Sequence, residues 1–193
     1  MKGPRPIQEL FDEVRDLIES RGISYAVMGG IAVSAWSMPR YTHDVDIALG
    51  IGAADVLPLL LAMDGAGYIV PDQFRHGWTD RLAGTRKLTV SKFIDGHVWD
   101  VDLFLEESEF LKSVIARRKF VDLDGRVTPL VTPEDLVLFK VLAGRPKDLG
   151  DLDGLLLVVG PLDDAYLVLW SQRLGIENQL RETWRRNGRE LRS

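Results

Sequence analysis

Two pairs of aspartates, each pair spaced by one residue inside an apolar run, constrain this chain more than any other feature. Asp44 and Asp46 lie in "DVDIAL", and Asp100 and Asp102 lie in "HVWDVDLFL". Both runs have the composition of a β-strand, in which residues i and i+2 point to the same face, roughly 6.5 Å apart. The fold must therefore accommodate like charges side by side on strand faces.

Neighbouring positions for these two strands would bring three or four carboxylates together. Like charges repel strongly in a low dielectric, so such a cluster calls for cations. Carboxylate oxygens favour hard cations such as Mg2+ or Mn2+, and two such ions form the usual clamp for nucleotidyl transfer. The alternative is that each Asp-x-Asp pair only ends a strand or lies in a turn, because short motifs produce many false matches.

Hydrophobic periodicity predicts an α+β fold. Residues 71–85 are polar and contain glycine, so they are expected to form a loop, and the Asp-Gly pairs at 95–96 and 124–125 predict tight turns. The expected domains are a core at 1–130, with a small mixed or antiparallel sheet flanked by helices, and a helical part at 131–193 packed on it. Helices are expected over 7–21, 31–38, 53–67, 108–118, 132–144, 147–159, 163–175 and 176–188, and strands over 23–28, 44–49, 86–94 and 97–105.

Composition excludes several classes of protein. The 193 residues contain no cysteine, which excludes disulfide scaffolds and thiolate metal sites and favours a cytoplasmic protein. The sequence contains no run of eighteen apolar residues, so no membrane span is predicted. The segment "MKGPRPIQELFDEV" does not resemble a signal peptide. The net charge of −5 argues against a molecule that is basic all over, so any contact with RNA or DNA must be local.

A glycine turn precedes the first aspartate pair. In "VMGGIAVSAW" a predicted strand leads into Gly29 and Gly30, and a short helix follows. Backbone N–H groups at such a helix N-terminus bind anions, and glycine lets a phosphate approach the main chain closely. The alternative is that Gly-Gly is only a tight turn.

These motifs together resemble the polymerase-beta-type nucleotidyltransferase superfamily. The resemblance lies in "GGIAVSAWSMPRYTHDVDIAL", followed by "WDVDLFL". The pattern R-x-T-x-D-x-D, here Arg40 to Asp46, is similar to the branch of the AbiEii-type toxins and the aminoglycoside and lincosamide nucleotidyltransferases. The segment "TPEDLVLFKVLAGRPKDLGDLDGLL" is similar to AbiEii-like proteins, so the likeness extends over most of the chain.

The resemblance implies a role for each matching residue. Gly29 and Gly30 would hold the triphosphate of an NTP, with Arg40 and Thr42 beside it. Two magnesium ions, or manganese in their place, would be ligated by three carboxylates. These are Asp44, Asp46 and Asp102, with Asp100 as a competitor of Asp102 for the third position.

Lys140 and two aspartates after it leave alternatives open. Lys140 lies among apolar helical neighbours, so it either extends to the surface or, as the resemblance implies, reaches the triphosphate. Arg40 would touch phosphate or screen the acidic cluster. Asp148 and Asp151 share a helix face and either pair with Arg145 or Lys147, which we favour, or line the acceptor site.

The acceptor is not determined by the sequence. RNA such as tRNA, a small molecule such as an antibiotic, and a protein hydroxyl all remain open, as does a cognate antitoxin partner. The arginines of "RETWRRNGRELRS" would either contact RNA or form a frayed tail. Residues 71–86 would either stack a base or form a surface loop without a ligand. This segment mixes aromatic and cationic side chains: Phe74, Arg75, His76, Trp78, Arg81 and Arg86. Asp148, Asp151 and Asp153 are candidates for holding a cationic antibiotic.

A non-catalytic regulator that retains the fold is the rival interpretation. Unpaired carboxylates kept together without chemistry to perform argue against it. The three histidines, His43, His76 and His97, show no metal-ligand spacing and are expected to be structural or exposed.

Overall fold

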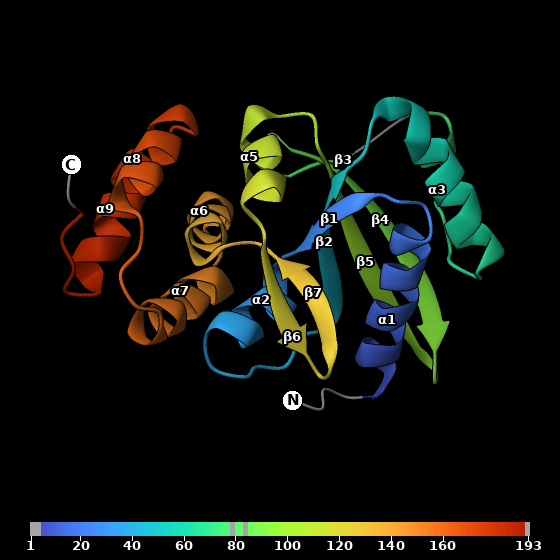
Figure 1. Ribbon diagram of the computed structural model, residues 1–193, viewed down its shortest axis with the longest axis horizontal. Coiled ribbons are helices and arrows are strands. Elements are labelled where there is room, and N and C mark those ends of the chain that lie inside the picture. Colours follow the sequence, from blue (N-terminus) through green and yellow to red (C-terminus); the bar gives the residue numbers. More distant parts are fainter. Residues whose placement is uncertain (1–4, 78–79, 83–84, 192–193) are drawn as a thin grey trace.

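A mixed β-sheet forms the centre of the computed structural model, which describes residues 5–77, 80–82 and 85–191. In the described part the sheet has seven strands in the order β3-β4-β5-β2-β1-β7-β6 (Figure 1). The strands are β1 (Ser24–Val27), β2 (Asp44–Gly50), β3 (Asp80–Leu82), β4 (Thr85–Ile94), β5 (His97–Leu105), β6 (Lys119–Leu123) and β7 (Arg126–Leu130).

Helices cover both faces of this sheet, and none of those in the described ranges is long and apolar enough to cross a membrane. Strand β2 runs parallel to β5, and β1 runs parallel to β7, whereas the other neighbours are antiparallel. The predicted α+β class with a mixed sheet is therefore confirmed. The helices are α1 (Arg5–Glu19), α2 (Gly29–Trp36), α3 (Ala53–Gly65), α4 (Asp72–Arg75), α5 (Glu109–Arg117), α6 (Pro133–Ala143), α7 (Pro146–Val158), α8 (Asp164–Arg173) and α9 (Glu177–Arg186).

Local signals explain where several elements begin and end. The Thr132 hydroxyl accepts a hydrogen bond from the Asp135 N–H at 3.2 Å and starts α6, and Gly144 ends that helix in the left-handed conformation. Asp95 and Gly96 both have positive φ, which is the turn that joins β4 and β5 tightly. These expectations from the sequence are confirmed.

The prediction of a loop over 71–85 is wrong. This region contains the short helix α4 and the strand β3, which pairs with β4. Period-two alternation is absent from such a short strand, so the sequence carries little signal for it. Trp78 and the side chain of Arg81 lie outside the described residues.

Alternation along β2 assigns the two faces of the sheet. Val45, Ile47 and Leu49 pack into a core with α1 and α3, whereas Ala48 packs into a second core with α5 to α9. Because successive side chains alternate, Asp44 and Asp46 lie on the same face as Ala48. Residues before and after position 130 share the second core, and the division of the chain at 130 stays a prediction.

Candidate active site

The two aspartate pairs lie on neighbouring strands. Parallel pairing of β2 with β5 sets Asp44 opposite Asp100 and Asp46 opposite Asp102. Residues opposite each other in a ladder point to the same face, so all four carboxylates lie on the side of the sheet that the C-terminal helices partly cover. The sequence predicts this juxtaposition only if the two strands are neighbours, and the pairing of β2 with β5 confirms that they are.

Asp102 and Asp100 have different surroundings. Asp102 lines a pocket of about 140 Å³ together with Asp44 and Asp46, and it accepts hydrogen bonds from Lys87 Nζ at 2.8 Å and Thr89 Oγ1 at 2.6 Å. Asp100 is exposed outside this pocket and accepts a hydrogen bond from Ser91 Oγ at 2.6 Å. Both aspartates of β5 are therefore neighbours of the first aspartate pair, but only Asp102 shares the pocket with it.

Lys87 and Thr89 were missed by the analysis of the sequence. A two-residue turn at Asp95 and Gly96 fixes the register of the β4–β5 hairpin, and counting back from it puts Thr89 opposite Asp102. The turn was recognised, so the register was available as a signal. Lys87 lies two residues further along the same face and reaches the Asp102 carboxylate.

The Gly-Gly turn lies directly against the first aspartate pair. Gly29 begins α2 with φ of 60°, and the Met28 N–H donates a hydrogen bond to the Asp46 carbonyl oxygen at 2.9 Å. A Cβ at Gly29 would lie 1.8 Å from Asp46 Oδ2, and one at Gly30 would lie 2.3 Å from Thr42 Oγ1. Gly29 therefore lets the start of α2 approach the Asp46 carboxylate, and Gly30 lets it approach Thr42.

Gly29→Ala is expected to disrupt this contact. The left-handed conformation alone costs an alanine roughly 1–3 kcal/mol, and the new methyl group must displace the Asp46 side chain. Thermal unfolding should show a clear loss of stability. The control is Gly150→Ala in α7, where a Cβ meets nothing within 4 Å and should stabilise the helix by about 0.5–1 kcal/mol. Equal stability of both variants would contradict the observed packing.

Asp46 is a carboxyl of the pocket with a strongly raised pKa. Burial raises its pKa to about 7, and repulsion by Asp44 and Asp102 adds to the effect of burial. Lys140 and Lys147 act in the opposite direction and lower it. A neighbouring cation would relieve this cost, because it favours the charged form of the carboxyl.

This raised pKa predicts how stability depends on pH in the absence of metal. Between about pH 4 and pH 7 the folded state holds a proton on Asp46 that the unfolded state has lost. Stability should therefore fall as the pH rises through this window, by up to about 4 kcal/mol, and then level off. The measurement is the difference in unfolding free energy between wild type and Asp46→Asn across pH in EDTA. Parallel profiles would contradict the assignment.

The segment between α2 and β2 holds the first aspartate pair in place. Thr42 Oγ1 donates a hydrogen bond to Asp44 Oδ1 at 2.7 Å. Arg40 Nε lies 2.9 Å from Asp151 Oδ1 of α7, and the Arg40 guanidinium lies close to Gly30. Arg40 and Thr42 therefore connect the glycine turn, the carboxylates and the C-terminal helices.

Lys140 is buried among carboxylates. Its Nζ donates hydrogen bonds to Asp148 Oδ1 at 2.9 Å and Asp151 Oδ2 at 2.7 Å. Arg145 Nε also contacts Asp148, at 2.6 Å. Burial raises the pKa of Asp148, but the hydrogen bonds from Arg145 and Lys140 outweigh burial and hold it below its usual value. The alternative that Lys140 extends to the surface is wrong, because its side chain is only 6% exposed.

Similarity to known proteins is found in the fold and not in the sequence. No protein-family model matches the sequence, and no curated protein matches it. Among solved structures, a candidate nucleotidyltransferase from Thermotoga maritima superposes with a TM-score of 0.51 at 15% identity, over 81% of this chain and 96% of that one. The chain has the nucleotidyltransferase fold. A nucleotidyltransferase-like antigenic protein from Paracoccidioides brasiliensis gives a TM-score of 0.49 at 19% identity, covering 84% of this chain and 86% of that one. A lincomycin-bound lincosamide adenylyltransferase gives a TM-score of 0.48 at 15% identity, over 79% of this chain and 97% of that one.

The donor groups of this nucleotidyltransferase fold suit a hard cation. Asp44, Asp46 and Asp102 supply only oxygen, the donor that Mg2+ prefers. In the described part of the chain, no three carboxylates or imidazoles are close enough to hold a metal ion as they stand. Asp102 is turned towards Lys87, so a metal at Asp102 would have to replace that ammonium group.

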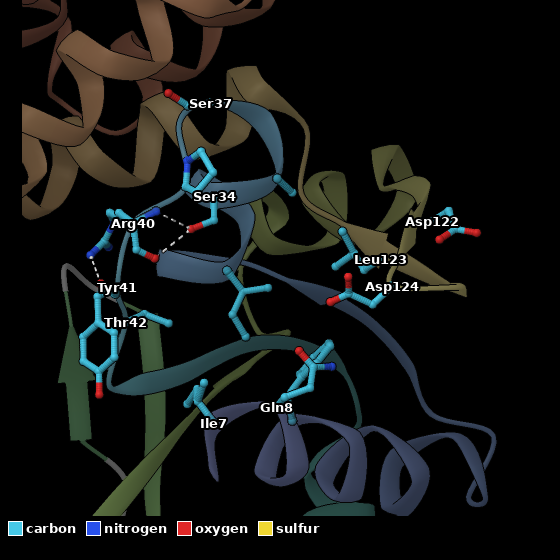
Figure 2. Close-up of a pocket in the computed structure, with 14 residues that line it drawn as sticks. Ile7, Gln8, Ser34, Ser37, Arg40, Tyr41, Thr42, Asp122, Leu123 and Asp124 are labelled. Carbon is cyan, nitrogen blue, oxygen red and sulfur yellow. Dashed lines mark hydrogen bonds between the residues drawn. The ribbon is translucent and has the colours of Figure 1, made fainter. Parts of the chain in front are cut away.

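A larger cavity of about 570 Å³ lies between α1, α2, the segment that follows α2, and the end of β6 (Figure 2). Its lining is mostly apolar and includes Ile31 of α2 and the segment that carries Arg40 and Thr42. Ser34 Oγ accepts a hydrogen bond from the Arg40 N–H and donates one to the Arg40 carbonyl oxygen, both at 3.2 Å. The smaller pocket holds the carboxylates and the glycine turn, so we take it as the candidate site.

Three of the described C-terminal arginines, Arg181, Arg186 and Arg189, are held by contacts within the chain. They lie in and after α9, which buries Leu180 and Trp184. Arg186 pairs with Asp153 at 2.7 Å, and Arg189 donates to the Leu156 carbonyl oxygen. The amphipathic spacing of Leu180 and Trp184 was the signal that this segment packs.

The other predicted candidates lie apart from the pocket. Phe74 is buried in α4, and Arg75 pairs with Asp64 at 2.9 Å, so neither is free to stack a base. His43 contacts Tyr41 with ring centroids 4.3 Å apart. His76 and His97 contact backbone carbonyl groups of their own turns.

Proposed function

We propose that this protein is a magnesium-dependent nucleotidyltransferase that transfers NMP from an NTP to a hydroxyl group of an acceptor. The observation that carries the proposal is one pocket in which Asp44, Asp46 and Asp102 lie beside the N-terminus of α2. A helix N-terminus that follows two glycines suits a triphosphate, and three carboxylates beside it suit the metal that accompanies it.

The residues divide the work of the proposed reaction. Gly29 and Gly30 receive the β- and γ-phosphates at their N–H groups, with Arg40 beside them, and Asp44 and Asp46 hold Mg2+. Bound Mg2+ would neutralise the negative charge that develops around the α-phosphorus. Asp102 orients the acceptor hydroxyl and takes its proton. The acceptor oxygen bonds to the α-phosphorus as the bond to the pyrophosphate oxygen breaks.

Lys140 acts in this proposal through its neighbours. Its ammonium group is enclosed by Asp148 and Asp151, and Asp151 also holds Arg40. Lys140 therefore positions the guanidinium group of Arg40 beside the glycine turn, and its own charge stabilises the ionised form of Asp46. Direct contact of Lys140 with the triphosphate, which the resemblance implies, would require it to leave a carboxylate.

The proposal does not depend on an RNA acceptor or an antitoxin. The role of an AbiEii-like toxin acting on tRNA would be favoured by exposed arginines, but those of α9 are largely paired. Asp148, Asp151 and Asp153 are engaged by cations of the chain itself, so they are not available to hold a cationic antibiotic.

The test is label transfer with Mg2+ and each of the four NTPs. Total tRNA, aminoglycosides, a lincosamide and no acceptor are incubated with wild type and with Asp46→Asn. Label on an acceptor that is lost in EDTA and in the variant supports the proposal. The absence of transfer, together with the absence of Mg2+-dependent NTP binding by calorimetry, would refute it and favour a non-catalytic module.

A further inference from the structure

In the part of the chain that the structure describes, one side of the candidate site is an exposed stretch of sheet. Cross-strand pairing aligns three pairs of residues in a row that runs away from the pocket towards the β4–β5 turn. We call this row the β4–β5 stripe. It consists of Thr89 with Asp102, Ser91 with Asp100, and Phe93 with Val98.

The far end of the β4–β5 stripe is apolar and exposed. Phe93 is 65% exposed and Val98 is 62% exposed, although both lie on a sheet face. The core that α5 to α9 form on this face reaches only as far as Phe104 of β5. Helices α6 to α9 lie on the opposite side of the molecule from β4 in Figure 1. An aromatic ring and a valine are therefore available as a flat surface beyond the pocket.

The order of strands indicates which side of the pocket receives the acceptor. The glycine turn follows β1, the first aspartate pair lies on β2, Asp102 lies on β5, and β4 comes next. In an in-line displacement the nucleophile enters opposite the leaving group. Pyrophosphate leaves on the side of β1 and α2, so the acceptor enters from β5 and β4.

The charge of the β4–β5 stripe selects the kind of acceptor. Asp100 is exposed, and no cation of the described residues forms an ion pair with it, since its observed partner is the Ser91 hydroxyl. Lys87, the neighbouring cation on this face, is engaged by Asp102. A row with one unpaired carboxylate and no spare cation repels phosphates and attracts an ammonium group.

We infer that the β4–β5 stripe binds the acceptor and that the acceptor is a small cationic molecule with a hydroxyl group, not RNA. The hydroxyl lies at Asp102, an ammonium group pairs with Asp100, and an apolar part rests on Phe93 and Val98. Strand spacing sets the hydroxyl and the ammonium roughly 6–7 Å apart, and the apolar part roughly 13 Å from the hydroxyl. This inference rests on the proposed function and assigns Asp100 as its specificity-determining residue.

Binding can be tested without relying on turnover. Amide chemical shifts of the full chain are followed with Mg2+ and α,β-methylene-ATP, while tobramycin, lincomycin, sucrose or total tRNA is added. Shifts at Ser91, Phe93 and Asp100 are expected with the two amines and not with sucrose. Asp100→Asn, which keeps an acceptor for Ser91, should weaken binding of the amines about fivefold. Phe93→Ser should weaken binding of lincomycin, because its apolar part loses the exposed ring.

The matched control is Asp55→Asn in α3, which removes the same charge from the other face of the sheet. An equal effect of both substitutions, shifts confined to other residues, or stronger shifts of the β4–β5 stripe with tRNA would each overturn the inference. Amides of Gly29 and Gly30 report nucleotide binding in the same samples. Failure of the proposed function would appear there, whereas failure of the acceptor assignment would appear on the β4–β5 stripe.

Discussion

Asp102→Asn is expected to lower nucleotidyl transfer by roughly 10²–10⁴-fold, the range for loss of a general base. The reason is that Asp102, inside the pocket, contacts the reacting hydroxyl in the proposed mechanism, whereas Asp100 lies outside the pocket. Asp102→Asn should reduce kcat and leave Mg2+-dependent NTP binding within a few-fold of wild type. Steady-state kinetics and calorimetry on the same preparation measure both effects.

Asp100→Asn provides the contrast for that prediction. It should raise KM for an amine-bearing acceptor and leave kcat close to wild type, because Asp100 binds the acceptor and takes no proton. Asp55→Asn should change neither quantity. If Asp100→Asn loses kcat while Asp102→Asn retains it, the third carboxylate is Asp100 and the proposed division of roles is wrong.

Lys140→Met is expected to destabilise the protein by about 3–5 kcal/mol, the cost of breaking a buried ion pair from one side. Asp148 is fully buried and Asp151 is 8% exposed, so both lose a partner that water cannot replace. For a chain of this length the midpoint of thermal unfolding should fall by about 10 °C. Calorimetry at pH 7 without nucleotide measures this directly.

Two further variants separate burial from charge. Lys147→Met removes an exposed lysine from the adjacent helix and should change stability by less than about 0.5 kcal/mol. Adding Asp148→Leu to Lys140→Met removes the stranded carboxylate and should recover part of the loss. Wild-type stability in Lys140→Met would mean that the pair contributes nothing in solution.

The four carboxylates of β2 and β5 show which features of the candidate site the sequence can predict and which it cannot. The i and i+2 spacing was sufficient to put Asp44 with Asp46, and Asp100 with Asp102, on strand faces. It could not select Asp102 over Asp100, because the pairs are alike until β2 meets β5 and α6 and α7 enclose one end. The partners of Lys140 were equally out of reach, since they depend on how α7 docks against α6.

The sequence by itself determined the features that act over a few residues. These are the caps at Ser108 and Thr132, the Asp-Gly turns and the alternation of β2, where sterics and local hydrogen bonds decide the backbone. Only the tertiary structure decided which carboxylates share a pocket, that Lys140 is buried, and that Arg186 of α9 pairs with Asp153. Those outcomes depend on many weak contacts between segments far apart in the chain, which no local pattern encodes.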